Sequence, residues 1–198
     1  MLTVRSLRIR GHAPVSFQVA GGECLAIQGP SGSGKTLLLR AIADLDPADG
    51  EIALGGENSR SLTGSAWRRR VRYLAAEPAW WADSVAAHFA APEKARKRAA
   101  SLGLPSGIFD RPVARLSAGE RQRLALLRAL EGDPRVLLLD EPTAALDAAS
   151  TRHVERLLKS LLKKGRILLL VSHAPRQAKR LARRKLVLGG AKIRERAS

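Results

Sequence analysis

The chain has 198 residues, of which 45% are hydrophobic, and a formal net charge of +17. This length suits one domain, and the hydrophobic share suffices for a buried core, which excludes wholesale disorder. The single cysteine, Cys24, excludes an internal disulfide, and we expect it to be a small buried hydrophobe. No apolar run approaches the roughly 20 residues that cross a bilayer, and the first residues predict a strand rather than a signal peptide.

The positive charge would attract nucleic acid, anionic lipid headgroups or nucleotides. The basic residues are spread along the chain without an aromatic platform for single strands, in "WRRRVR", "EKARKRAA", "LLKKGR" and "APRQAKRLARRK". Three interpretations stay open: a compositional bias on solvated faces, contact with an anionic membrane surface and, least favoured, nucleic acid.

The first part of the chain predicts short strands over residues 2–9, 15–19 and 23–29, separated by glycine and proline turns. The third strand runs into a glycine-rich loop, which a predicted helix over residues 35–45 follows. A further strand is predicted over residues 50–56. These strands indicate an N-terminal antiparallel β subdomain.

The second part alternates helices and apolar strands. Residues 76–116 look helical and basic, although prolines interrupt them. Beyond them, continuous apolar strands over 135–141 and 166–172 flank a helical pattern over 147–164. Continuous apolar strands that alternate with helices predict a parallel sheet covered on both faces. We therefore expect an α/β fold with a mostly parallel core sheet and a small helical subdomain.

The loop "GPSGSGKT" matches the phosphate-loop pattern G-x-x-x-x-G-K-[ST] between a predicted strand and a predicted helix. Glycines let the backbone N–H groups turn toward phosphates, the lysine reaches the β- and γ-phosphates, and the threonine hydroxyl ligates Mg²⁺. We predict a P-loop NTPase that binds a nucleoside triphosphate. The predicted binding residues are Gly29, Pro30, Ser31, Gly32, Ser33, Gly34, Lys35 and Thr36, with Lys35 also catalytic.

Two acids follow the apolar run in "VLLLDEP". Asp140 is expected where a buried strand emerges at the carboxyl edge of the sheet, and there it would complete the Mg²⁺ shell with Thr36. Glu141 would polarise the attacking water. The structural alternative for Asp140 is a helix cap or turn residue.

A second possible anion site lies in "LSAGERQR". Ser117 and Glu120 form an S-x-x-E capping box, which predicts a helix that begins near Ala118. Gly119 leaves the surface bare, so a phosphate could approach the N–H groups at this helix start. Taken alone, however, the pattern is only a good capping box.

With "LLLDEP", "AALD" and "SH" following in order, "LSAGERQR" resembles the LSGGQ signature of ABC transporter ATP-binding subunits. The resemblance runs from "LTVRSLRI" to "KLVLGG". It implies one ABC-type ATPase domain over 1–198, with a catalytic core of 1–75 and 132–198 and a helical subdomain of 76–131 that contains the signature helix. It also implies a head-to-tail homodimer with two-fold symmetry, in which the signature residues Ser117, Gly119 and Glu120 of one copy contact the γ-phosphate of ATP held by the other.

The resemblance also assigns roles to single residues outside these motifs. Glu141 is similar to the family's general base, a role typically worth roughly 10²–10⁴ in rate. His173 resembles the switch histidine that contacts the γ-phosphate, and Asp147 in "AALD" resembles the D-loop aspartate near the dimer seam. The usual serine of that loop is replaced by Ala144.

Two positions depart from the family pattern. The Q-loop glutamine, a usual Mg²⁺ ligand, is replaced by Ala76, so water or Glu77 would fill its place, and we favour water. The adenine-stacking aromatic before the second strand is missing, which leaves His12 or Arg10. His12 is expected either to stack on the base or to be a plain turn residue.

The resemblance implies an ATP-hydrolysing subunit that uses ATP and Mg²⁺ to drive a separate membrane permease. The subunit would lie in the cytoplasm, at the inner face of the membrane. Its compact length most resembles small bacterial subunits, metal and iron exporters among them. Trp80 and Trp81 lie where relatives receive a helix of the permease, so we expect at least one to contact a partner or, alternatively, both to pack between subdomains.

Two other functions remain as alternatives. One is a soluble ABC-type ATPase acting on nucleic acid or ribosomes, which only the charge of +17 supports. The other is a nucleotide-binding regulatory module with little turnover, which Ala76 motivates.

Overall fold

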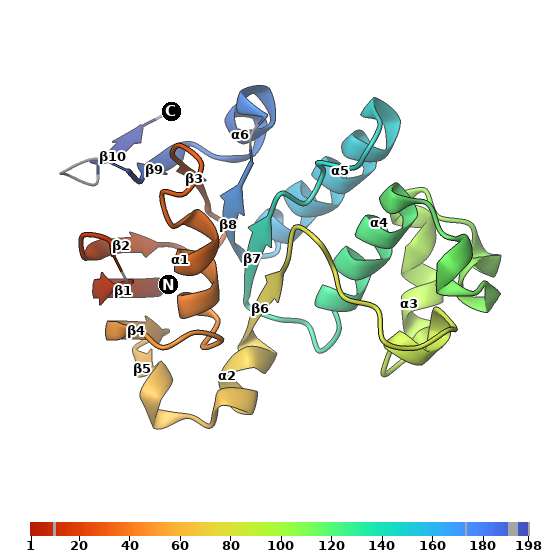
Figure 1. Ribbon diagram of the computed structural model, residues 1–198, viewed down its shortest axis with the longest axis horizontal. Helices are drawn as coiled ribbons and strands as arrows, with labels where there is room; N and C mark the ends of the chain where they lie inside the picture. Colours follow the sequence, from red (N-terminus) through yellow and green to blue (C-terminus); the bar gives the residue numbers. More distant parts are fainter. Residues whose placement is uncertain (10, 173, 190–193, 198) are drawn as a thin grey trace.

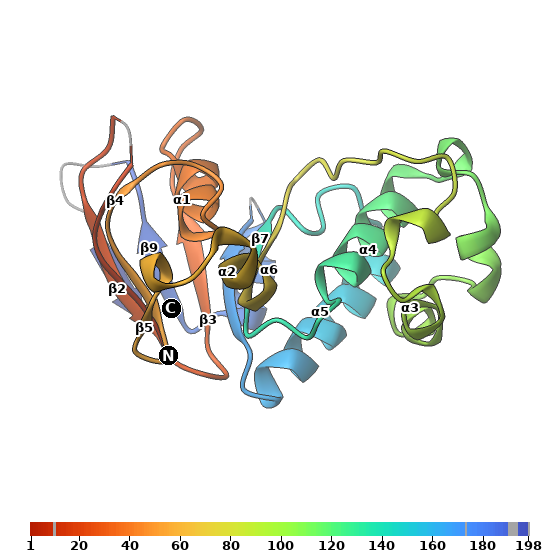
Figure 2. The ribbon, with the colours of Figure 1, turned by 90° about the horizontal axis from the view of Figure 1, so that it is seen from below.

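The computed structural model describes residues 1–9, 11–172, 174–189 and 194–197. Two β-sheets and their covering helices lie on one side of the molecule, and a smaller helical region lies on the other (Figure 1). The same division is visible from below, with α3 and α4 away from the N-terminal strands (Figure 2). The predicted residue bounds of the subdomains stay a prediction.

The N-terminal sheet is antiparallel and has the strand order β2-β1-β4-β5. Side chains of β2 alternate between buried and exposed, because successive residues of a strand point to opposite faces. The expected antiparallel β subdomain is therefore present. Its strands are β1 (Leu2–Arg8), β2 (Val15–Val19), β4 (Asp49–Leu54) and β5 (Glu57–Asn58).

The second sheet has the order β10-β9-β3-β8-β7-β6, and all its pairs are parallel except β10 with β9. All residues of β7 and β8 are buried, as the continuous apolar runs predict for strands covered on both faces. The expected mostly parallel core sheet is confirmed. Its strands are β3 (Cys24–Gln28), β6 (Val71–Leu74), β7 (Val136–Asp140), β8 (Ile167–Val171), β9 (Arg184–Val187) and β10 (Arg194–Ala197).

This sheet separates two hydrophobic clusters. Alternate residues of β7 belong to different clusters: Leu138 packs with α1 and the N-terminal sheet, whereas Leu137 and Leu139 pack with the helical region. The helical region therefore shares its core with one face of the sheet. The α-helices are α1 (Lys35–Ile42), α2 (Gly64–Arg70), α3 (Pro92–Ala99), α4 (Ala118–Ala129), α5 (Ala148–Lys163) and α6 (Pro175–Leu181).

The middle of the chain is less helical than its composition indicates. Between residues 76 and 116 the only α-helix is α3, and the rest consists of 3₁₀ helices and loops. Prolines interrupt the backbone hydrogen bonding of a helix, which accounts for the short turns here. The 3₁₀ helices are Ala86–His88, Ala100–Leu102, Ser106–Asp110 and Val113–Arg115, with a further one at Ser59–Ser61.

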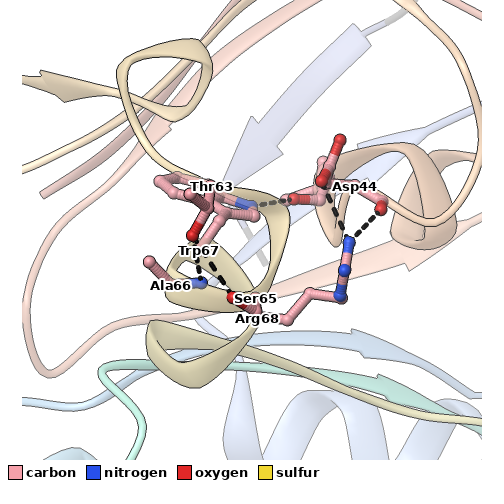
Figure 3. A network of polar contacts seen from close by, with 7 residues as sticks. Asp44, Thr63, Ser65, Ala66, Trp67 and Arg68 are labelled. Carbon is pink, nitrogen blue, oxygen red and sulfur yellow. Dashed lines mark hydrogen bonds and ion pairs between the residues drawn. The ribbon is translucent and has the colours of Figure 1, made fainter.

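Helix α2, which the sequence patterns did not indicate, is fixed to the end of α1 by the contacts shown in Figure 3. The indole Nε1 of Trp67 donates to the carbonyl of Ile42 at 2.8 Å, and Trp67 is 1% exposed. Arg68 donates to both the carbonyl and the carboxylate of Asp44, and Thr63 caps the helix. Because α2 leads directly into β6, these contacts also place β6 beside β7.

We expect Trp67→Phe to lower the free energy of unfolding by about 1–3 kcal/mol, because the Ile42 carbonyl loses its donor inside the core. Urea unfolding measures this change, which should appear as a lower midpoint at an unchanged m-value. Trp81→Phe is the control, since Trp81 is 68% exposed and should change stability by less than about 0.5 kcal/mol. Equal midpoints for the two variants would contradict the proposed role of the Trp67 hydrogen bond.

Candidate nucleotide-binding site

The phosphate loop joins β3 to α1. Gly34 precedes α1 in the left-handed conformation with φ 86°, which is strained for residues other than glycine. A Cβ atom at Gly29 would lie 2.5 Å from the carbonyl oxygen of Leu188. The Nζ of Lys35 donates to the carbonyls of Gly29 and Pro30, at 2.9 and 2.8 Å. The loop is therefore folded tightly around its own lysine at the start of α1.

A cavity of about 310 Å³ lies against this loop. Besides the loop, Ala76, Asp140 and Glu141 line it, so the structure brings the predicted acids to the predicted phosphate loop. Gly29, Pro30 and Ser33 do not line the cavity, whereas the other predicted loop residues do: Ser31, Gly32, Gly34, Lys35 and Thr36.

Asp140 is the centre of the polar contacts in this site. It ends β7, is 3% exposed, and its Oδ2 accepts hydrogen bonds from Thr36 Oγ1 at 2.7 Å and from the Tyr73 hydroxyl at 3.1 Å. Burial, followed by the charge of Asp140 and the hydrogen bond to it, raises the pKa of Tyr73 above its ordinary value. Tyr73 therefore stays protonated and acts as a hydrogen-bond donor that orients the carboxylate.

The residues present fit a magnesium ion bound together with phosphates. Asp140 forms no ion pair within the described part of the chain, and a buried carboxylate without a cation is costly. No group of three or more His, Cys, Asp or Glu residues that could hold a metal exists among the described residues. A site with Thr36 and Asp140 suits Mg²⁺, which commonly takes one or two protein oxygens, several waters and substrate phosphates.

Glu141 follows Asp140 in a left-handed conformation with φ 47. Its N–H donates to the carbonyl of Val171 at 3.0 Å, so the ends of β7 and β8 hold its backbone. A non-glycine residue in this region is uncommon and often marks a functional position. Ala76 lines the same cavity, whereas Glu77 is exposed and does not line it. Water in place of the missing glutamine stays a prediction.

The two predicted histidines have different outcomes. His12 lies in a turn, and its N–H donates to the carbonyl of Ile9 at 3.0 Å. Its ring packs on the phosphate loop, since a Cβ atom at Gly34 would lie 2.8 Å from His12 Nε2. The structure thus brings His12 to the loop, and its stacking on adenine stays a prediction. His173 lies outside the described residues.

The signature segment lies elsewhere. The predicted capping box is present: Glu120 N–H donates to Ser117 Oγ at 3.1 Å, and Ser117 N–H donates to Glu120 Oε2 at 2.8 Å. Helix α4 begins at Ala118, as expected, and is separated from α1 in both views (Figures 1 and 2). Ser117, Gly119 and Glu120 therefore do not line the cavity at the phosphate loop of their own chain.

The segment predicted as a D-loop packs directly on the signature glycine. A Cβ atom at Gly119 would lie 3.1 Å from the carbonyl oxygen of Ala145 and 3.3 Å from Leu146. The carboxylate of Asp147 caps α5 by accepting from Ser150 N–H at 2.7 Å. Close packing within the chain thus leaves little room for a side chain at position 119, independently of any role toward a phosphate.

The sequence matches the ABC transporter family over residues 12–144. The chain belongs to this family of ATP-binding domains. It is 40% identical to the ATP-dependent lipid A-core flippase of Burkholderia pseudomallei (strain 1710b), over 93% of this chain and 33% of the relative. The chain thus spans about a third of the length of that relative. With the Escherichia coli (strain K12) "Probable iron export ATP-binding protein FetA" it shares 34% identity, over 80% of this chain and 76% of the relative.

A solved structure supports the fold. It is a dimeric ATP-binding cassette in a post-hydrolysis state bound to ADP and Pi, with a TM-score of 0.81. The alignment covers 100% of this chain and 98% of that chain at 23% identity. The ABC-type ATPase fold predicted from the motifs is confirmed.

The sequence patterns missed Tyr73 as a residue of the ABC-type site. It stands in "VRYLAAEP", three residues before the position of the missing glutamine. The available signal was its place three residues before Ala76, on a strand that enters the loop.

Tyr73→Phe removes one of the two hydroxyl donors to Asp140. Because outer-shell partners of a metal ligand are typically worth about 10–100-fold in metal affinity, we expect the Mg²⁺ concentration for half-maximal ATP hydrolysis to rise about tenfold. Nucleotide affinity measured without Mg²⁺ is the control and should not change. An unaltered Mg²⁺ dependence would show that the hydroxyl does not support the metal site.

Glu120→Gln tests the capping box through pH. The pKa of Glu120 lies below its ordinary value of 4.5, first because Ser117 N–H donates to the carboxylate. A carboxylate with a lowered folded-state pKa stabilises the fold above its unfolded-state pKa, and this contribution is lost as pH falls through the folded-state value. Glutamine keeps the acceptor but loses the charge, so we expect the free energy of unfolding of the wild type to exceed that of Glu120→Gln by about 0.3–1 kcal/mol at neutral pH.

Unfolding free energies measured at decreasing pH should show this difference shrinking once the pH passes below the ordinary value of 4.5. Glu93→Gln is the matched control, because the Glu93 side chain is 81% exposed. A difference that stays constant on acidification would contradict the assignment.

Proposed function

We propose that this chain is the ATP-binding and ATP-hydrolysing subunit of an ABC membrane transporter, which works as a head-to-tail homodimer and drives a separate permease. The observation that carries the proposal is that two segments suited to bind an anion lie apart in one chain. The phosphate loop and the capped start of α4 belong to one chain, yet only the loop lines the cavity with Asp140. A second copy would supply the start of α4 that this cavity lacks.

Lys35, Thr36 and Asp140 would hold the β- and γ-phosphates of ATP and the magnesium ion. Bound Mg²⁺ would neutralise charge that develops on the transferred phosphoryl group. Glu141, which lines the same cavity, would take a proton from the attacking water, and His173 would contact the γ-phosphate. The small Ala76 leaves room for a water at the metal.

The signature end of α4 suits a phosphate from another copy. The N–H groups and dipole of a helix start favour an anion. Two copies related by two-fold symmetry would complete two sites, since each provides one loop and one signature. The solved relative with ADP and Pi is itself a dimer, which supports this arrangement.

Several features support a membrane partner. The relatives named above are an ATP-dependent flippase and an iron export ATP-binding protein. The second of these supports our comparison with small bacterial subunits of metal exporters. Among the described residues no helix is long and apolar enough to cross a membrane, so the membrane passage would belong to another protein or segment. The net charge of +17 would draw the chain to the anionic inner face of the membrane.

Mg-ATP should bring Glu141→Gln into a dimer, because the variant binds ATP but lacks the base that consumes it. Sedimentation velocity with and without Mg-ATP is the measurement, alongside phosphate release by wild type. A variant that stays monomeric at saturating Mg-ATP would contradict the proposal. Phosphate release that Glu141→Gln does not lower would favour the regulatory module.

Ser117→Asp in the Glu141→Gln background is the matched control. Aspartate caps a helix about as well as serine, so α4 should persist. Its carboxylate would repel the γ-phosphate of the other copy, and we expect no dimer. Binding of DNA that falls steeply with salt would instead favour the nucleic-acid alternative.

A further inference from the structure

Helix α6 carries a buried amide that joins two segments next to the cavity at the phosphate loop. Gln177 is 1% exposed, and its Oε1 accepts hydrogen bonds from Thr143 Oγ1 at 3.0 Å and from Ser172 Oγ at 2.9 Å. Thr143 lies two residues after Glu141, beyond the end of β7. Ser172 follows directly on β8 and immediately precedes His173. One oxygen atom therefore connects the two segments that carry the residues proposed for hydrolysis.

The pairing of β7 with β8 ends before it reaches these segments. Its last register pair is Asp140 with Val171, and the N–H of Glu141 then donates to the carbonyl of Val171 at 3.0 Å. Beyond that point, a hydrogen bond from Ala144 N–H to the carbonyl of Glu141 folds the first segment into a turn. The side chain of Gln177 thus provides a connection between the two segments past the end of the sheet.

The hydroxyl of Ser172 also ties the backbone on the far side of position 173. It accepts from the N–H of Ala174 at 3.1 Å while it donates to Gln177. The backbone N–H of Gln177 in turn donates to the carbonyl of Ala174 at 3.0 Å. The residues directly before and after His173 are therefore both linked to Gln177.

Helix α6 is itself anchored to α5 by an ion pair. Arg180 donates through Nε and Nη2 to the two carboxylate oxygens of Glu155, at 2.9 and 2.5 Å, and Glu155 is 6% exposed. Paired hydrogen bonds of this kind fix orientation as well as position. The acceptor that Gln177 offers thus belongs to a helix that is fixed to its neighbour.

The amide nitrogen of Gln177 indicates that packing alone does not account for this residue. Its Nε2 is buried without a hydrogen-bond partner, and an unpaired buried donor is unfavourable. An apolar side chain of equal length would avoid that cost, but the hydroxyls of Thr143 and Ser172 would lose their shared acceptor. Local features that cost stability are expected chiefly at functional sites. What this position provides is therefore the oxygen rather than the bulk of the side chain.

We propose that Gln177 is a positioning residue for ATP hydrolysis, whose Oε1 holds the segments of Glu141 and His173 at a fixed separation. This inference rests on the proposed function, because it takes up the roles given there to these two residues. Gln177, Thr143 and Ser172 do not line the cavity at the phosphate loop, so the link acts on the chemical step rather than on nucleotide binding. A displacement of roughly 1 Å in groups that act on a substrate can lower the rate about a hundredfold.

Gln177→Met tests the link, because methionine has the length of glutamine without its oxygen. We expect kcat for ATP hydrolysis at saturating Mg-ATP to fall at least about tenfold, while the Kd for nucleotide changes less than about twofold. Phosphate release gives kcat, and calorimetric titration with a non-hydrolysable ATP analogue gives the Kd. Thr143→Val removes one of the two donors and should lower kcat less. In the double variant it should have no further effect, since the link is already lost.

Val19→Ala is the control for a loss of stability alone. Val19 is fully buried in β2, at the edge of the N-terminal sheet, and does not line the cavity. The variant should lower the urea midpoint through the space it leaves in the core, yet keep kcat within about twofold. If Gln177→Met does not fold, Thr143→Val and Ser172→Ala carry the test, with the same expected fall of kcat at an unchanged Kd.

Three results would overturn the inference. The first is a wild-type kcat in Gln177→Met, or a fall of kcat matched by an equal loss of nucleotide affinity. The second is that the effects of Thr143→Val and Gln177→Met multiply in the double variant. The third is that Gln177→Met abolishes the Mg-ATP dimer of Glu141→Gln in sedimentation velocity, which would place its effect at the interface between copies.

The same assays separate this inference from the proposed function. Phosphate release that Glu141→Gln does not lower would contradict the proposed function. An inactive Glu141→Gln beside a fully active Gln177→Met would disprove this inference alone.

Discussion

The hydrogen bond between Thr36 and Asp140 joins residues 104 positions apart, and the candidate site depends on it. It is possible because β3, β8 and β7 are neighbouring parallel strands, whose carboxyl ends meet at one edge of the sheet. The loop after β3 and the acids after β7 therefore reach the same cavity. Disruption of this strand order would separate the phosphate loop from the metal-binding carboxylate, even if each motif kept its local shape.

The elements that the sequence predicted correctly are determined by residues close to one another in the chain. The start of α4 followed from Ser117 and Glu120, which bind each other's backbone within one turn. The strands β7 and β8 followed from continuous apolar runs. In both cases the physical cause lies within a few residues of its effect.

The elements and contacts that the sequence did not predict depend on residues far apart in the chain. The segment "RRRVRYL" begins with three arginines and shows no clear strand pattern, and its strand β6 is defined by pairing with Val136–Leu139. The hydrogen bond of Tyr73 to Asp140 spans 67 residues, and the contact of Arg128 with Trp81 joins α4 to a loop. In residues 76–116 the basic composition indicated helix, but prolines leave only short 3₁₀ segments around α3.

Tyr73 takes part in two places at once, because it lines a cavity of about 510 Å³ between β6 and α4, while its hydroxyl donates to the Asp140 carboxylate beside the phosphate loop. Tyr73 thus lines one cavity and reaches the other only through its hydrogen bond to Asp140. A ligand in the first cavity and a cation bound by Asp140 would both influence the orientation of the Tyr73 ring. A ligand bound at one of these places would therefore change the surroundings of the other through a single side chain.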